Sequence, residues 1–483
     1  MKTNMTSNFL WRFFERIGAQ GVTLVVSIVL ARMLGPDVYG EIALVTVFIN
    51  ILQVFVDAGL ANALIQKSEV DDLDYSSVFF SNVFVCCVLY IGVFLLAPFI
   101  AEFYNNLELI PIIRVLSIII LISGVKNVQQ AYIARNMLFK LFFFATLGGT
   151  ITAAIVGIVM ASLGFGIWAL VAQLLVNTAI DTLVLWVKLA WKPKWQFSIK
   201  RLSKLFGYGW KLLVSSLLET IYNESYQLLI GKFYSSSELA YFNQGKKLPN
   251  AFVSNINSSI DSIIFPAMSR EQDHIPEVKK IAKKAMKVST FCVWPVLTGM
   301  FACGNTIVYL LLGERWVDSA WFLRLYCICF AFYPIYTSNL NAIKSLGRSD
   351  LFLKMEMLKK ISGISILLAT LWFGLKALSI GIVLEAVTSL VINTMYSKRI
   401  LNYSLLEQIK DLSSHLFICI LMGVIVFFVG MIPFSMLFVL MLQITIGIVS
   451  YYLLAKLFNV ESLDYIINYV KRLVLRIHFI KHK

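Results

Sequence analysis

Four sets of polar residues at helical spacing lie inside otherwise apolar parts of the chain, and they form two pairs that repeat at offsets of 199 and 204 residues. The first pair is Arg12, Arg16, Gln20, Thr23 and Ser27 with Lys211, Ser215, Glu219, Tyr222 and Tyr226; the second is Thr46, Asn50, Gln53 and Asp57 with Asn250, Ser254, Asn257 and Asp261. Steps of three and four place each set on one helix face. Lipid cannot satisfy a hydrophilic face within a membrane span, so such a face must look at protein or water. The repetition indicates a watery cavity between two similar lobes, which is the layout of a transporter.

The composition predicts the elements that must position these residues. Hydrophobic residues make up 59% of the chain and charged residues 14%, with a mean hydropathy of +0.79. Apolar stretches of about 20 residues, long enough to cross a bilayer, recur along it. We therefore expect an all-α polytopic membrane protein with about fourteen transmembrane helices. The predicted spans are 13–34, 40–60, 78–101, 109–133, 138–162, 165–189, 207–233, 239–266, 285–312, 317–343, 351–374, 378–397, 412–434 and 436–457.

The charge pattern predicts the topology. The net charge is +15, and the bases gather in alternate loops, which is the positive-inside pattern and places both termini in the cytoplasm. This placement argues against nucleic acid as a partner. One inside loop, residues 68–77, is acidic. The seven cysteines all lie within predicted spans without a C-x-x-C pair, so neither a disulfide framework nor a zinc site is expected. The first span lacks the features of a removable signal peptide and should be retained.

The spans group into two pseudo-symmetric six-helix lobes plus two C-terminal helices. We expect an N-terminal lobe at 1–189, a basic amphipathic cytoplasmic connector at 190–206, a second lobe at 207–400, two additional transmembrane helices at 401–458 and a basic cytoplasmic tail at 459–483. The connector should direct its bases to lipid phosphates and its aromatic rings into the membrane interface. Both lobes start in the cytoplasm with an even number of spans, so the repeats are parallel, about an axis along the membrane normal.

One segment carries a family resemblance. Residues 30–44, LARMLGPDVYGEIAL, followed by residues 57–66, DAGLANALIQ, resemble Wzx-type polysaccharide (O-antigen, lipopolysaccharide biosynthesis) flippases. These belong to the multidrug/oligosaccharidyl-lipid/polysaccharide exporter (MOP) superfamily, which also contains multidrug extruders and the lipid II flippase. The span number, basic connector and lobe repeat extend the likeness over essentially the whole chain. The nearest likeness is to the colanic-acid type.

The resemblance implies a function and a location. It implies alternating-access translocation of an undecaprenyl-diphosphate-linked oligosaccharide from the cytoplasmic to the periplasmic leaflet of the bacterial inner membrane. Other polysaccharide assembly proteins are candidate partners. Motif residues 34–37 and 39–40 would shape the tight external turn between the first two spans, without contacting substrate.

Three basic residues near the cytoplasmic ends of their helices are candidates for capturing the diphosphate. They are Arg12, Arg16 and Lys211. Arginine presents a fork that matches phosphate oxygens, and lysine presents a compact charge. The alternative is that these side chains extend to the lipid headgroups.

Lys246 and Lys247 are placed deeper. They lie eight and nine residues beyond Glu238, and Pro249 should loosen the helix just after them. A charge at the membrane centre costs a few kcal/mol, so we expect these lysines to line the cavity and hold the anionic headgroup. The alternative is that the span starts later and both are extracellular. Asn250 on the same stripe is a further candidate.

Aromatic and acidic residues complete the candidate site. Tyr222 and Tyr226 could stack on sugar rings. Asp57 and Asp261 would either pair with cations of their own lobes, as structural or gating contacts, or bind a coupling ion. The expected cations are Arg12 or Arg16 for Asp57, and Lys211 for Asp261.

Glu219 is the candidate for coupling to H⁺ or Na⁺, because a buried carboxylate can exchange a proton at ordinary pH. The alternative is a salt bridge to Lys247. Glu224 lies about 140° around the helix from Glu219. Lys126 and Lys344 are weaker cavity candidates, and Asp181 is unassigned.

An enzyme is not expected, nor is any cofactor or metal. The four histidines are dispersed, no nucleotide-binding P-loop sequence occurs, and the D-x-D at 72–74 lies in a short loop. An ion gradient or the membrane potential would therefore drive transport. A membrane polysaccharide polymerase or ligase would need a larger external loop. The remaining alternatives are an ion-coupled multidrug or organic cation exporter, which would favour an acidic cavity, and a structural scaffold.

Overall fold

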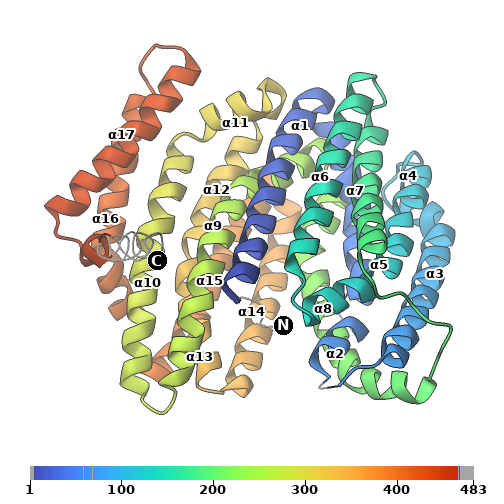
Figure 1. The fold of residues 1–483 in the computed structure, drawn as a ribbon. Coiled ribbons are helices and arrows are strands. Elements are labelled where there is room, and N and C mark those ends of the chain that lie inside the picture. Colours follow the sequence, from blue (N-terminus) through green and yellow to red (C-terminus); the bar gives the residue numbers. More distant parts are fainter. Residues whose placement is uncertain (1–4, 58, 68, 466, 468–483) are drawn as a thin grey trace, which may run out of the picture. The chain divides into compact units, whose positions relative to one another are not determined.

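The computed structural model describes the backbone of residues 5–57, 59–67, 69–465 and 467, and their side chains except those of residues 5–17, 208 and 349. Within these residues the chain is helical and contains no strand, as the apolar periodicity predicts. It divides into two compact units, Met1–Ala240 and Tyr241–Lys483. Figure 1 labels the helices of both.

The first unit is built around one long, broken helix. Its helices are α1 (Met5–Asp57), α2 (Leu60–Gln66), α3 (Asp72–Phe103), α4 (Leu109–Leu116), α5 (Ile118–Arg135), α6 (Phe139–Ser162), α7 (Ile167–Lys188) and α8 (Ile199–Phe233). Helix α1 packs on α5, α6 and α8. It is interrupted at Gly35, whose φ of 80° is a left-handed conformation that glycine adopts without strain, and Pro36 then restarts the helix.

The motif at residues 30–44, which contains Gly35 and Gly40, contacts the start of α9 (Ser236–Arg270) just after α8 ends. The Tyr39 hydroxyl donates to the Ser27 carbonyl across the break at 3.1 Å. Gly40 lies so close to the backbone of Ser236 that a β-carbon there would overlap it. The Ser237 hydroxyl also donates to Asp37. The motif residues therefore form the break in α1 and also contact the start of α9.

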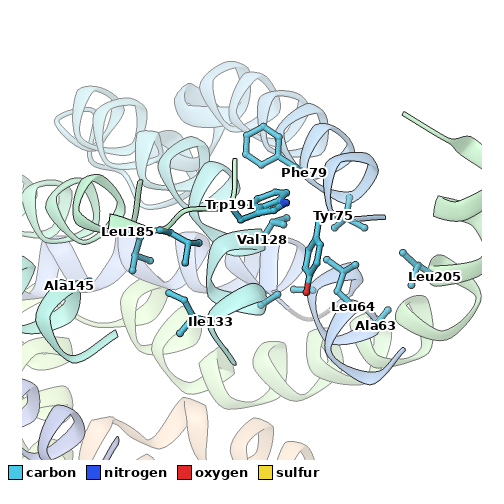
Figure 2. Close-up of a cluster of buried hydrophobic side chains, with 14 residues drawn as sticks. Ala63, Leu64, Tyr75, Phe79, Val128, Ile133, Ala145, Leu185, Trp191 and Leu205 are labelled. Atoms are coloured by element: carbon cyan, nitrogen blue, oxygen red, sulfur yellow. The ribbon is translucent and has the colours of Figure 1, made fainter. Parts of the chain in front are cut away.

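The connector contributes to the core of the first unit. Trp191 is only 7% exposed and packs beside Tyr75, with ring centroids 5.3 Å apart (Figure 2). Leu205 joins the same cluster of buried side chains. Trp195, by contrast, is 94% exposed. The expectation of interfacial aromatic rings thus does not hold for Trp191, because helices α3 and α5 offer it an aromatic protein environment.

The acidic loop before α3 pairs with the bases of the connector. Lys194 forms an ion pair with Asp72, and the Arg201 guanidinium lies 3.1 Å from Asp71 and 3.3 Å from Asp74. Asp74 is fully buried and forms a capping box with Asp71 at the start of α3. These carboxylates neutralise bases that we expected to face lipid phosphates, which accounts for an acidic segment in a basic environment.

The second unit begins at Tyr241, within α9. Its helices are α9 (Ser236–Arg270), α10 (Ile275–Ala302), α11 (Gly304–Leu312), α12 (Ser319–Ala331), α13 (Tyr333–Ser345), α14 (Ser349–Thr370), α15 (Leu375–Leu401), α16 (Leu405–Val429) and α17 (Met436–Leu457), with short 3₁₀ turns at Glu314–Trp316 and Leu371–Phe373. The two C-terminal helices pack together, and both contact α10 (Figure 1). A buried network joins α13 to α16, since Asn339 donates to Gln408 at 3.1 Å and accepts from Ser397 at 3.0 Å.

Ten helical segments of the described chain are long and apolar enough to cross a membrane. One of them, Gly18–Gln66, contains both of the first two predicted spans because the helix continues across Gly35. The predicted spans at 207–233, 239–266 and 351–374, which correspond to α8, α9 and α14, are not among the ten. These helices carry charged residues along much of their length. A polytopic helical membrane protein is confirmed, and the number fourteen stays a prediction, as do the lobe boundaries.

Candidate functional site

The polar stripe on the second half of α1 meets α8. The Asn50 amide donates to the Glu224 carboxylate at 3.1 Å, and Gln227 donates to the same carboxylate. One helical turn further along α1, Gln53 donates to Asp57 at 3.1 Å. Asn50 and Asp57 remain exposed within their unit. The stripe therefore combines internal hydrogen bonds with polar atoms that stay accessible.

The same carboxylate–amide contact occurs in both units. Asn127 of α5 donates to Asp57 at 2.9 Å, and Asn341 of α13 donates to Asp261 of α9 at 2.8 Å. The two aspartates hold equivalent positions in the repeated stripes. Each aspartate thus accepts a hydrogen bond from a neutral amide of the fourth or tenth predicted span. The pairing of these aspartates with the cations considered from sequence stays a prediction. An amide orients a carboxylate without cancelling its charge, which leaves the charge available to a cation.

Lys126 and Asp181 form an ion pair inside the first unit. Their side chains, from α5 and α7, are 3.0 Å apart and only 14% and 12% exposed. From the sequence, Lys126 could equally be a base at the membrane interface, and Asp181 has no role because it lacks an evident polar stripe. The presence of one buried base and one buried acid in the same predicted lobe is the signal that could have paired them.

Helix α8 presents two different faces. Its glycines contact the rest of the unit, with Gly209 against Gly59 and Gly231 against Leu44. The predicted stripe lies about half a turn around the helix from these glycines. Accordingly Lys211 and Glu219 are exposed, and Tyr222 and Tyr226 are partly buried.

Glu224 makes a contact at the α1 stripe that sequence periodicity does not predict. It lies on the packed face of α8, with the glycines, and it is the carboxylate that reaches the α1 stripe. The stripe pattern selected Glu219 because it repeats the α1 spacing. Helix periodicity alone cannot show that a second acidic face meets another helix.

The candidate lysines lie well inside α9, which starts at Ser236. The Lys246 ammonium is 5.9 Å from the ring centre of Tyr326, within the range of a cation–π contact. Lys247 and Asn250 are exposed within their unit. Further along the stripe Asn257 is buried and accepts a hydrogen bond from Ser289 at 2.8 Å. The stripe is thus exposed at its start and packed near its end.

The side chains of Arg12 and Arg16 lie outside the described part of the structure, so their proposed contact with a diphosphate stays a prediction. Among the residues that the structure describes, no group of three His, Cys, Asp or Glu side chains is placed to hold a metal ion.

An apolar groove of about 420 Å³ lies in the second unit, between α16 and helices α10, α12, α13 and α15. Trp294, Phe332, Leu412 and Leu416 are among its lining residues, and Gln408 lies at the buried polar network. Such a groove excludes water and suits a hydrocarbon chain better than a sugar.

Long apolar helices with embedded polar faces define a polytopic α-helical membrane protein of transporter-like architecture. The chain belongs to the polysaccharide biosynthesis protein family, whose model matches residues 29–321.

Two relatives show how far this similarity extends. The lipopolysaccharide biosynthesis protein WzxC of Escherichia coli is 24% identical over 404 residues, which cover 82% of this chain and 80% of that protein. The succinoglycan biosynthesis transport protein ExoT of Rhizobium meliloti is 23% identical over 317 residues. This second match covers 66% of this chain but only 64% of ExoT, just under two thirds of its length.

Solved structures share the fold. The lipid II flippase MurJ, in an inward closed conformation, matches 94% of this chain and 98% of its own with a TM-score of 0.77 at 15% identity. An inward-facing multidrug resistance transporter of the MATE family matches 79% of this chain and 94% of its own, with a TM-score of 0.63 at 14% identity. At this identity the likeness concerns the fold alone.

Proposed function

We propose that this protein is a flippase that moves an undecaprenyl-diphosphate-linked oligosaccharide from the cytoplasmic to the periplasmic leaflet of a bacterial inner membrane. Both termini would lie in the cytoplasm. The two lobes would alternate in access, driven by an ion gradient or the membrane potential. The names of the relatives, which concern polysaccharide biosynthesis and transport, support the substrate class.

One observation carries the proposal: polar side chains on the stripes of long helices remain exposed within their units. Asn50 of α1, Glu219 of α8, and Lys247 and Asn250 of α9 are the examples. Hydrocarbon lipid cannot satisfy these groups, so they must face water, protein or a polar substrate. The hydroxyl groups of a sugar headgroup also require hydrogen-bond partners, since crossing the membrane without them would cost several kcal/mol for each polar group.

The charged and apolar parts of the substrate have separate candidate contacts. Lys246 and Lys247 would bind the diphosphate by charge-assisted hydrogen bonds, and Tyr222 and Tyr226 would stack on sugars. The isoprenoid chain would stay in lipid, and the apolar groove of the second unit offers it an additional surface. This division of labour favours an anionic lipid-linked substrate over an organic cation.

Gene deletion tests the function most directly. Loss of the protein should make one lipid-linked oligosaccharide accumulate on the inner leaflet, where a membrane-impermeant lectin reaches it only in inverted vesicles. If no lipid-linked sugar accumulates and the cells instead lose efflux of a cationic dye, the protein is a cation exporter.

Variants of the two lysines test the site. We expect Lys247→Ala and Lys246→Ala to insert normally and to reduce translocation in reconstituted vesicles at least tenfold. Lys376→Ala is the matched control, because Lys376 is exposed at the start of α15. Undiminished translocation by both variants would remove these lysines from the mechanism without affecting the deletion result.

A further inference from the structure

A second basic site lies far along the chain from the residues discussed so far. A cavity of about 310 Å³ opens where the first turns of α10 meet the segment that follows α17. Four lysines of α10 line it on one side, and Glu461, Ser462 and Tyr465 line it on the other.

The four lysines share one face of α10. They are Lys280, Lys283, Lys284 and Lys287, at steps of three, one and three. Neighbouring like charges on a helix destabilise it, so such a face needs anions nearby. The contacts of each lysine decide whether the protein supplies them.

Two of these lysines have carboxylate partners from other helices or segments. Lys283 pairs with Asp411 of α16 at 2.6 Å, and Lys287 pairs with Glu461 at 2.8 Å. The hydrogen bond from Lys287 holds the pKa of Glu461 below its ordinary range, so this carboxylate is ionised at neutral pH. Asp411 and Glu461 therefore each form an ion pair with one of these lysines.

The other two lysines leave a positive excess at the cavity. Lys280 contacts Glu277 of its own helix at 3.4 Å, and both side chains are more than half exposed. The Lys284 ammonium lies 3.8 Å from the ring centre of Tyr465, which is a cation–π contact and provides no negative charge. Among the described residues, the four ammonium groups of the lining thus have three carboxylate contacts, and the charge of Lys284 remains in excess.

The position of the cavity along the helices indicates the kind of anion. Helix α10 continues from Lys287 into its apolar part, and α17 ends at Leu457, four residues before Glu461. The cavity therefore adjoins the ends of two helices that are long and apolar enough to cross a membrane, where lipid headgroups would lie. Lysines at this level attract phosphate groups of anionic lipids.

We propose that this cavity is a binding site for the phosphate of an anionic phospholipid headgroup, separate from the lysines of α9 that would hold the transported substrate. Lys280 and Lys284 donate to the phosphate oxygens, and the ring of Tyr465 covers one side of the site. Lys283 and Lys287, held by Asp411 and Glu461, add to the positive potential. The site does not depend on transport, so its test is a binding measurement.

The test uses the full-length protein in neutral phosphatidylcholine–detergent micelles, with cardiolipin titrated in and thermal unfolding and lipid retention measured. We expect saturable binding that weakens as salt is raised, because the contacts are charged and partly exposed. The double variant Lys280→Gln/Lys284→Gln should bind at least tenfold more weakly. Lys354→Gln/Lys398→Gln removes the same charge from exposed positions outside the cavity and should bind within twofold of the unaltered protein.

A variant that is expected to strengthen cardiolipin binding excludes misfolding as the cause of weaker binding. Glu461→Gln removes the one carboxylate of the lining and frees Lys287, so cardiolipin should bind several-fold more tightly. Equal binding by Lys280→Gln/Lys284→Gln, or weaker binding by Glu461→Gln, overturns the proposal. Inorganic phosphate without cardiolipin should give little stabilisation; a shift as large as that from cardiolipin would identify a soluble phosphate as the ligand and overturn the lipid assignment.

Discussion

Asn127 donates a hydrogen bond to Asp57 at 2.9 Å across two helices of the first unit. The second unit repeats this contact with Asn341 and Asp261 at 2.8 Å. The amide fixes the carboxylate but does not neutralise it. The repeated feature is therefore an oriented negative charge, consistent with the proposed gating or ion-binding role of both aspartates.

Removing the amides of Asn127 and Asn341 should lower the free energy of unfolding and alter the rate of transport. Asn127→Leu and Asn341→Leu each delete one hydrogen bond to a charged acceptor, which we expect to lower the free energy of unfolding by about 1 kcal/mol because both carboxylates are partly accessible to water. Thermal unfolding of the purified protein measures this. Asn223→Leu, at an exposed position of α8, is the control. If both amide variants unfold and transport like the control, the repeated contact has no role.

The ion pair between Lys126 and Asp181 gives a second prediction. Removing one partner leaves an uncompensated charge that is largely buried, at a cost of about 3 kcal/mol. Lys126→Met and Asp181→Leu alone should therefore lower the unfolding temperature and the amount of inserted protein. The double variant should recover most of both, because it removes the unpaired charge. A double variant as unstable as the sum of the two single variants would show that the residues do not interact.

The sequence predicts the helices well because their signals are local. Apolar runs of membrane-spanning length, the glycine break at Gly35 and the repeated polar stripes all follow from neighbours along one helix. The contacts of Asp57, Glu224 and Trp191 depend on which helices pack together, and periodicity contains no such information. Trp191 shows the limit well: in sequence it resembles an interfacial aromatic residue, and only the aromatic environment of α3 and α5 makes it part of the core.

The close approach at Gly40 predicts an effect of a single methyl group. A β-carbon there would overlap the backbone of Ser236, which cannot move aside as a flexible side chain could. Gly40→Ala should therefore lower the free energy of unfolding by about 1–3 kcal/mol, as overpacking does. Gly21→Ala is the matched control in the same helix, because a β-carbon at Gly21 meets no atom within 4 Å. Since glycine inside a helix is less stable than alanine, the control should be neutral or stabilising. Equal effects of both variants in thermal unfolding would contradict the contact.

Two aspartates at the start of α3 should differ in how much stability their substitution removes. Asp74 is buried, completes the capping box of α3 with the N-cap residue Asp71, and contacts both Lys67 and Arg201. We expect Asp74→Ala to destabilise the first unit by about 2 kcal/mol, mostly through the lost cap and the lost ion pairs. Asp72 forms an exposed pair with Lys194, so Asp72→Ala should cost less than about 1 kcal/mol. Limited proteolysis within residues 190–198 measures release of the connector. Equal cleavage of both variants would argue against a buried anchor at Asp74.

Helix α8 carries two glutamates whose surroundings predict different roles in ion coupling. Glu219 is exposed on the stripe, whereas Glu224 accepts hydrogen bonds from Asn50 and Gln227 on the packed face. A carboxylate that exchanges a coupling ion must be reached by that ion, which favours Glu219. We expect Glu219→Gln to abolish the acceleration of lipid-linked oligosaccharide translocation by an imposed H⁺ or Na⁺ gradient, while translocation without a gradient continues. Glu224→Gln should keep the gradient response and lose some thermal stability, since the amide retains the shape but not the charge that Asn50 contacts. The reverse result, with the gradient response lost only in Glu224→Gln, would move the coupling site to the interface of α1 and α8.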